Sequence, residues 1–148
     1  MVSINNLTSY QINEDLLKQV VEEVLKTEHQ KGEISLAFIG PARMRKLNRM
    51  YRKKNRVTDV LSFPEREVKF KEFAIEGIEK SPSLGEIVIC LREVKKSAKR
   101  ANIPFEQQLL RVLIHGVLHL IGYDHEKSKE EAEKMREKQE NYLKRFLK

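Results

Sequence analysis

The sequence predicts one α/β domain over residues 1–148, a small mixed β-sheet packed with about five helices around a central buried helix. Strand and helix patterns alternate along the chain, with at least one strand–helix–strand unit between residues 34 and 63. The length of 148 residues is enough to bury a single core. A composition of 40% hydrophobic and 34% charged residues is typical of a folded domain and excludes a disordered chain.

The predicted elements follow from the period of the apolar residues and from the residues at the ends of each pattern. In chain order they are a helix over 13–28, a strand over 33–40, a helix over 41–51, strands over 59–63 and 86–91, and helices over 93–101, 104–121 and 128–146. Residues 65–83 show no clean period, and we expect a long connection or flap there.

The residues that end each pattern support the first four elements. Asn13 can cap the first helix, because its side chain can accept a hydrogen bond from the first turn. Apolar and polar residues alternate from Ile34 to Phe38, which indicates a strand. Pro41 suits the first turn of the next helix, where its missing N–H is not needed. Pro64 closes the short strand that follows.

Similar signals support the remaining elements. The β-branched residues of 86–91 are typical of a buried strand. Pro104 separates a weak helix from the strongest helical segment, and Gly122 ends that segment. Ser128 and Glu131 match a capping box at the start of the last helix. The second half of the chain is therefore expected to be mostly helical.

The charge of the chain points to a polyanionic partner. Lysine and arginine total 29 against 22 acidic residues, which gives a net charge of +7 and a pI near 9.5. A basic excess attracts nucleic acids, because each neutralised phosphate releases condensed counterions. Solubility alone is the alternative explanation. The charge therefore favours contact with nucleic acid without establishing it.

The residue types also predict the compartment. A single cysteine, Cys90, excludes an internal disulfide framework and fits a reducing cytosol, and we expect it to be a core residue. No stretch approaches the roughly 20 apolar residues that span a membrane. The first ten residues are too polar for a secretory signal. We therefore expect a cytoplasmic protein without membrane contact.

The strongest helical segment carries one narrow polar seam. Nine of the thirteen residues between Leu109 and Ile121 are apolar, so this helix should be buried on most sides. Its polar positions fall on one stripe, formed by Gln108, Arg111, His115, His119 and Gly122. Unpaired buried polar groups cost about 1–3 kcal/mol each. The seam therefore needs partners, and a metal ion is one of them.

Three of the four histidines lie between residues 115 and 125, in the stretch HGVLHLIGYDH. His115 and His119 are one helical turn apart, about 6 Å between Cβ atoms, which allows both imidazoles to reach one ion. A turn at Gly122 would bring His125 to the same point. This spacing is that of the metzincin zinc peptidases. We expect one zinc ion, or another divalent transition metal, on three histidines and a water.

A catalytic base is missing from this pattern. In zinc peptidases of the HExxH type, a glutamate beside the first histidine takes the proton from water, and here that position is Gly116. A metallopeptidase would need another base, such as Asp124 or Glu126. Asp124 can equally form a turn or support a ligand histidine. A non-catalytic RNA-binding factor with a structural zinc is a further alternative.

Three blocks together resemble one family. HGVLHLIGYDH, with LNRMYRKKNRVTDVLSFP at 47–64 and LGEIVIC at 84–90, resembles the YbeY family of bacterial metal-dependent endoribonucleases that act in ribosomal RNA maturation. The resemblance implies a zinc site at His115, His119 and His125. It also implies ribosomal RNA on the small ribosomal subunit as partner, and a role in ribosome quality control.

The resemblance further implies a functional arginine at Arg52. Its guanidinium can hold phosphate in bidentate fashion, so we expect it to steady the phosphate during cleavage. Lys53 and Arg111 are expected as further substrate contacts. The favoured substrate is single-stranded RNA, because a flexible backbone enters a narrow groove readily. The metallopeptidase using the same three histidines remains the alternative function.

Overall fold

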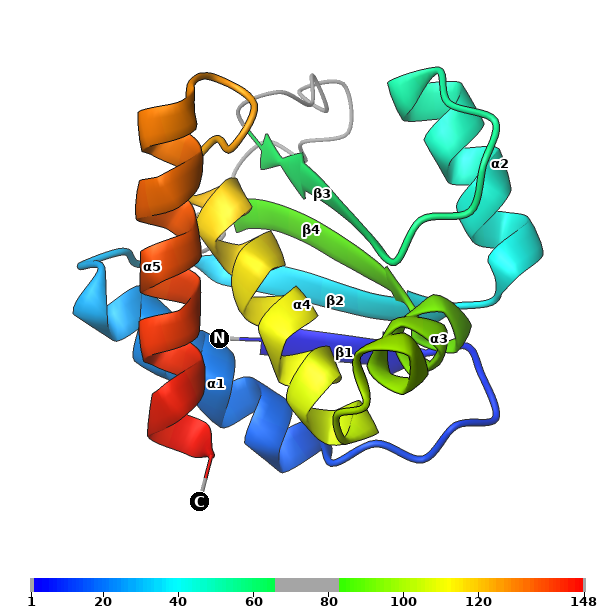
Figure 1. Ribbon diagram of the computed structural model, residues 1–148, viewed down its shortest axis with the longest axis horizontal. Coiled ribbons are helices and arrows are strands. Elements are labelled where there is room, and N and C mark those ends of the chain that lie inside the picture. The colour runs from blue at the N-terminus through cyan, green and yellow to red at the C-terminus, as the bar shows by residue number, and fades with distance from the viewer. Residues whose placement is uncertain (1, 66–82, 148) are drawn as a thin grey trace, which may run out of the picture.

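The computed structural model describes residues 2–65 and 83–147, and nine helices and strands follow one another within these ranges (Figure 1). They are β1 (Val2–Asn6), α1 (Glu14–Thr27), β2 (Glu33–Ile39), α2 (Pro41–Arg52), β3 (Val60–Pro64), β4 (Ser83–Cys90), α3 (Leu91–Ala101), α4 (Phe105–Leu120) and α5 (Lys129–Phe146). The long connection or flap expected over 65–83 falls on residues 66–82, outside the described residues.

The four strands form one sheet in the order β1-β2-β4-β3. β1, β2 and β4 are parallel, whereas β3 is an antiparallel edge strand beside β4. This mixed sheet with five helices confirms the predicted fold class. β1 was not predicted, because only Val2 and Ile4 carry its alternation, and its pairing with β2 from Val2↔Ile34 to Asn6↔Phe38 joins segments distant in the sequence.

Helices cover both faces of the sheet, because the strands direct alternate side chains to opposite sides. Figure 1 shows α4 lying across one face with α1, α3 and α5 around it, while α2 lies apart. Phe38 and Ile87 belong to the main core under α4, whereas Ile39 and Val88, their neighbours in sequence, pack with Met44 of α2 on the other face.

The central helix is α4, as the sequence predicts. Nine of its residues are buried: Leu109, Leu110, Val112, Leu113, Ile114, Gly116, Val117, Leu118 and Leu120. It contacts α1, α3, α5, β3 and β4. Although α4 is the most apolar of the helices, none within the described ranges is both long and apolar enough to cross a bilayer.

Two predicted helix caps are confirmed. The Asn13 side chain accepts a hydrogen bond of 3.2 Å from the backbone N–H of Leu16 at the start of α1. The Ser128 hydroxyl accepts one of 3.1 Å from the backbone N–H of Glu131 at the start of α5. Because these caps fix where α1 and α5 begin, they also set the lengths of the connections that precede them.

Candidate metal centre and RNA cleft

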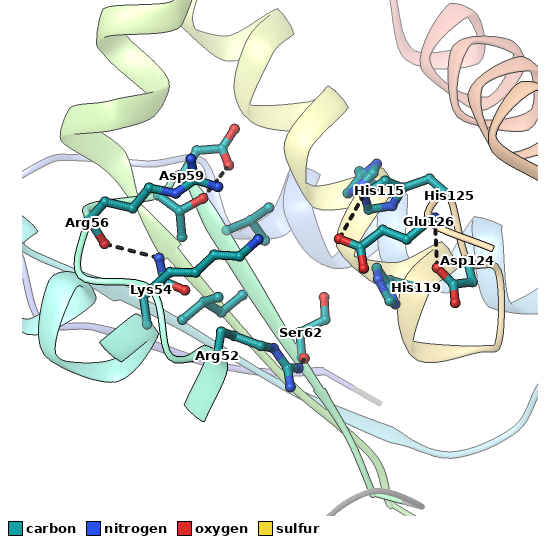
Figure 2. Close-up of a pocket in the computed structure, with 14 residues that line it drawn as sticks. Arg52, Lys54, Arg56, Asp59, Ser62, His115, His119, Asp124, His125 and Glu126 are labelled. Carbon is teal, nitrogen blue, oxygen red and sulfur yellow. Dashed lines mark hydrogen bonds and ion pairs between the residues drawn. The ribbon is translucent and has the colours of Figure 1, made fainter. Parts of the chain in front are cut away.

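A cleft of about 530 Å³ separates the segment from α2 to β3 from the C-terminal end of α4 and the loop that follows it (Figure 2). One wall carries the cations Arg52, Lys54 and Arg56. The opposite wall carries the histidines at 115, 119 and 125 together with two carboxylates. A row of cations therefore faces a cluster of metal-ligating side chains across one cavity.

The three histidine rings converge on this cleft. The ring centroids of His115 and His119 on α4 are 6.3 Å apart, and that of His125 lies 5.2 Å from the first and 5.6 Å from the second. Gly122 adopts φ 115, a conformation that residues with side chains rarely adopt. The backbone N–H of Gly122 donates to the His119 carbonyl and that of Tyr123 to the Leu118 carbonyl, which ends α4 and turns the chain back with His125.

Hydrogen bonding fixes the orientation and tautomer of His115. Its Nδ1 lies 2.8 Å from the side-chain carbonyl oxygen of Gln139, which can only accept a hydrogen bond. Nδ1 therefore carries the proton, and Nε2 remains available as a metal ligand. Burial lowers the pKa of His115, which favours the neutral ring that metals bind.

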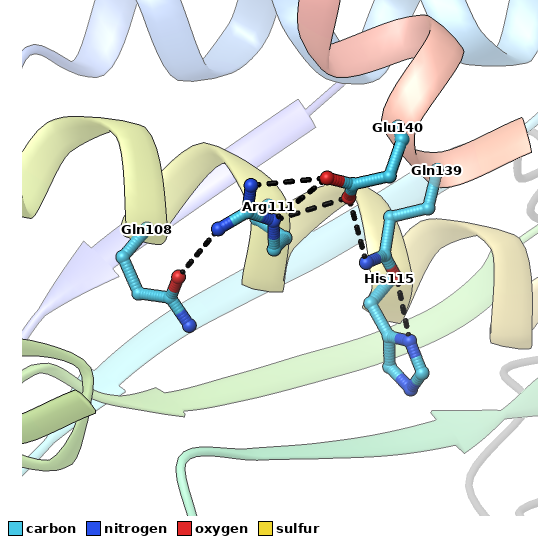
Figure 3. A network of polar contacts seen from close by, with 5 residues as sticks. All are labelled: Gln108, Arg111, His115, Gln139 and Glu140. Carbon is cyan, nitrogen blue, oxygen red and sulfur yellow. Dashed lines mark hydrogen bonds and ion pairs between the residues drawn. The ribbon is translucent and has the colours of Figure 1, made fainter. Parts of the chain in front are cut away.

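Figure 3 shows that this hydrogen bond is one end of a longer network between α4 and α5. The Gln139 amide donates a hydrogen bond of 3.2 Å to the Glu140 carboxylate. The same carboxylate accepts hydrogen bonds of 3.1 and 3.0 Å from Nε and Nη2 of Arg111. Arg111 also donates to Gln108 over 2.9 Å. These hydrogen bonds from Arg111 and its charge lower the pKa of Glu140. Arg111 and His115 of the polar seam on α4 thus find partners on α5.

Arg111 is consequently engaged away from the cleft. It is not among the described residues that line the cavity, and its guanidinium is held by Glu140. The structure therefore does not bring Arg111 to the position of a substrate contact. Its visible role is to hold Glu140, which in turn orients Gln139 against His115.

His119 and its neighbours in space fit a metal ion. Its Nδ1 is buried and has no hydrogen-bond partner within the described parts of the chain, so no protein group fixes this ring as Gln139 fixes His115. Ligand atoms of His119, Asp124 and His125 all lie within 4.8 Å of one another. Imidazole nitrogens with a carboxylate oxygen suit zinc and related divalent ions.

Asp124 was expected as a turn residue, a support for a ligand or a base, and not as a ligand. Its Oδ1 accepts a hydrogen bond of 2.9 Å from the backbone N–H of Glu126, which confirms the turn. The same carboxylate also belongs to the group of possible ligand atoms formed with His119 and His125, a group that does not include His115. Its place directly before His125 was the available signal for this second role.

Arg52 ends α2 beside the cleft. One of its Nη atoms donates to the backbone carbonyl of Ser62 over 2.6 Å, and its guanidinium carbon lies 5.2 Å from the centre of the Phe63 ring. Lys53 takes the left-handed φ of 58 that terminates the helix and is not among the lining residues, whereas Lys54 is. The structure thus brings Arg52, and not Lys53, to the cavity.

Asn48 was not singled out from the sequence. It is only 3% exposed, and its side-chain amide donates to the backbone carbonyl of Arg56 over 3.0 Å. This bond holds the segment after α2 so that Lys54 and Arg56 line the cleft. The available signal was a polar residue four positions after Met44 on the apolar side of its helix.

Gly116 lies where α4 approaches the sheet most closely. Its carbonyl accepts a hydrogen bond of 3.2 Å from the Ser62 hydroxyl. A Cβ at this position would lie 3.0 Å from Cγ2 of Ile87 and 3.4 Å from the hydroxyl of Ser62. The glutamate that zinc peptidases carry beside their first histidine would therefore be in tight contact with Ile87 from its first side-chain carbon.

This chain is similar to members of one protein family in both sequence and fold. A family model described as Endoribonuclease YbeY matches residues 3–147. The Endoribonuclease YbeY of Thermodesulfovibrio yellowstonii is 46% identical over 114 residues, which cover 74% of this chain and 64% of the relative. That of Geobacillus thermodenitrificans is 39% identical over 144 residues, which cover 96% of this chain and 90% of the relative.

A solved structure shares the fold. The solution structure of TM1509 from Thermotoga maritima superimposes with a TM-score of 0.66 at 33% identity, covering 97% of this chain and 87% of that one. The relatives are named as nucleases, which are hydrolases, and this agrees with the enzyme class predicted from the sequence. Their names do not support the metallopeptidase alternative. The chain belongs to the Endoribonuclease YbeY family.

Proposed function

We propose that the protein is a divalent-metal-dependent endoribonuclease that cleaves single-stranded RNA in the cleft beside the histidines. The observation that carries this proposal is the convergence of three imidazole rings, with centroids 5.2 to 6.3 Å apart, opposite a wall of cations. Family membership supports the reaction, because the curated relatives carry the name of an endoribonuclease.

We assign the metal to the ring nitrogens of His115, His119 and His125, with zinc as the first candidate and Asp124 beside them. When bound, the ion supplies a Lewis acid and an activated water as nucleophile. The Gln139 hydrogen bond keeps the His115 ring turned with Nε2 as its available nitrogen. The neutral form that burial favours at His115 is the form that binds metal.

The cation wall binds the RNA backbone. A guanidinium can hold two phosphate oxygens in bidentate fashion, and that of Arg52 is placed at the cavity by its hydrogen bond to the Ser62 carbonyl and its contact with the Phe63 ring. Lys54 and Arg56 extend the positive wall along the cavity. An unpaired strand can follow such a groove by bending its backbone, which a duplex cannot do as readily.

The broader setting belongs to the same proposal. Ribosomal RNA of the small subunit is the substrate that the family resemblance implies, and the net charge of +7 suits it. A cytoplasmic location follows from the single cysteine and from the substrate. The candidates for the proton acceptor in the cleavage step are Asp124 and Glu126, the carboxylates on the histidine side of the cleft.

Metal analysis paired with an RNA cleavage assay tests the proposal. We expect about one zinc per chain, cleavage of a single-stranded RNA that a chelator abolishes and added zinc restores, and poor cleavage of the matching duplex. Cleavage that persists after all three histidines are replaced by alanine would reveal a contaminating nuclease. Chelator-sensitive digestion of an unfolded protein, without RNA cleavage, would instead establish the metallopeptidase.

Replacing Arg52 with lysine should lower kcat/KM for RNA by roughly 10²-fold while the zinc content stays unchanged. Lysine keeps the charge but loses the fork that can hold two phosphate oxygens. Lys53→Ala is the matched control, because Lys53 is the adjacent cation and does not line the cleft. Full activity in Arg52→Lys with a loss in Lys53→Ala would mean that charge density, and not the geometry of Arg52, determines the rate.

A further inference from the structure

A largely buried carboxylate joins α1 to the loop and helix that complete the metal centre. Glu28 is the residue after α1, and its side chain is only 9% exposed. Its Oε1 accepts a hydrogen bond of 2.6 Å from the Tyr123 hydroxyl. Its Oε2 accepts one of 2.9 Å from the Lys138 ammonium and another from the Tyr142 hydroxyl. One carboxylate therefore accepts hydrogen bonds from three donors that lie in distant parts of the sequence.

Two of these donors are next to residues of the metal centre. Tyr123 stands directly before Asp124 and two positions before His125, in the loop that follows α4. Lys138 stands directly before Gln139, whose side chain orients His115. The Lys138 ammonium also lies 5.5 Å from the centre of the Tyr123 ring. Glu28 is thus tied to both segments that present groups to the site, although it lines no part of the cleft described above.

The hydrogen bonds keep this carboxylate charged. Burial alone would raise the pKa of Glu28, but the hydrogen bonds from Tyr123, Tyr142 and Lys138, with the Lys138 charge, outweigh burial and lower it. The same contact, added to burial, raises the pKa of Tyr142 to about 12, so its hydroxyl remains a donor. A buried ionised group that accepts three donors resists displacement of any of them.

We propose that Glu28 is a positioning residue of the metal centre, which holds the loop bearing His125 through the Tyr123 hydroxyl. The inference rests on the proposed metal-binding function. Without this contact the loop would still be covalently continuous with α4 and α5, but His125 would sample more positions. A ligand held in one position binds metal more tightly, because less conformational entropy is lost on binding.

Two tyrosine variants separate positioning from general stability. Tyr123→Phe and Tyr142→Phe each remove one hydroxyl from the same carboxylate and keep the ring, but only Tyr123 lies in the loop that carries a ligand. Zinc affinity is measured by competition with a chelating indicator, and stability by urea unfolding of the metal-free protein. We expect similar shifts in the urea midpoint, but a zinc affinity about 10- to 100-fold weaker in Tyr123→Phe alone.

Glu28→Gln provides a second test, because it removes the charge and leaves one accepting oxygen where the carboxylate has two. We expect it to weaken zinc binding as Tyr123→Phe does. Unchanged zinc affinity in Tyr123→Phe, or equal losses in both tyrosine variants that follow their stability, would overturn the positioning role. A wild-type protein that binds no zinc would overturn the proposed function as well, which separates the two failures.

Discussion

Replacing His119 with alanine should abolish zinc binding and lower RNA cleavage by roughly 10³-fold or more. His119 belongs to both candidate ligand sets, the three histidines of the proposal and the group with Asp124 and His125 whose ligand atoms lie within 4.8 Å of one another. Its loss therefore disables the site whichever set holds the ion. Its Nδ1 lacks a hydrogen-bond partner among the described residues, so the substitution leaves no buried partner unpaired there.

The metal-free His119→Ala protein should remain folded, with a free energy of unfolding within about 2 kcal/mol of the metal-free wild type. It should still bind single-stranded RNA, with an affinity that falls as salt rises. Circular dichroism, urea unfolding, zinc content and the cleavage assay measure these outcomes. His29→Asn is the control, because His29 is exposed at φ 55, a conformation that asparagine tolerates.

Each alternative gives a different result for the same variant. A chain that unfolds when His119 is replaced would indicate a structural zinc, as in the non-catalytic RNA-binding factor. Full cleavage with no bound zinc would mean that the reaction does not take place at this metal site. The control shows what the loss of a histidine outside the cleft does, so only a difference between His119→Ala and His29→Asn reports on the site.

Local patterns made most of the fold predictable. The polar seam on α4 could be read from the spacing of Arg111 and His115, because a helix places such residues on one side. The turn at Gly122 followed from the need for a residue that tolerates a positive φ. β1 could not be predicted in the same way, since its stability comes from the ladder with β2 and not from its own five residues.

The contacts that complete the site depend on pairs far apart in the sequence. His115 and Gln139 are 24 residues apart, and Glu28 and Tyr123 are 95 residues apart. The residue spacing within one helix or loop therefore cannot predict either contact. The cation wall shows the same limit. The left-handed turn at Lys53 decides which of the successive basic residues line the cleft, and the sequence indicated only that they were clustered.

Gly116→Glu, which introduces the residue that zinc peptidases carry at this position, should strongly destabilise the protein instead of creating a peptidase. The first side-chain carbon alone would lie 3.0 Å from Cγ2 of Ile87. Overpacking of this kind costs about 1–3 kcal/mol, and burying an unpaired carboxylate adds several more. We expect a loss of roughly 4 kcal/mol or more, against a total stability of about 5–15 kcal/mol for a domain of this size.

Two further substitutions separate volume from charge at this position. Gly116→Ala meets Ile87 at the same 3.0 Å but gains about 1 kcal/mol of helix propensity, so its stability should stay within about 1.5 kcal/mol of the wild type. Gly116→Gln has the size of glutamate without its charge and should fall between the two. Urea unfolding of the metal-free proteins gives this order. A stable Gly116→Glu protein that digests unfolded polypeptide would mean that α4 can move away from Ile87, and it would return the metallopeptidase to consideration.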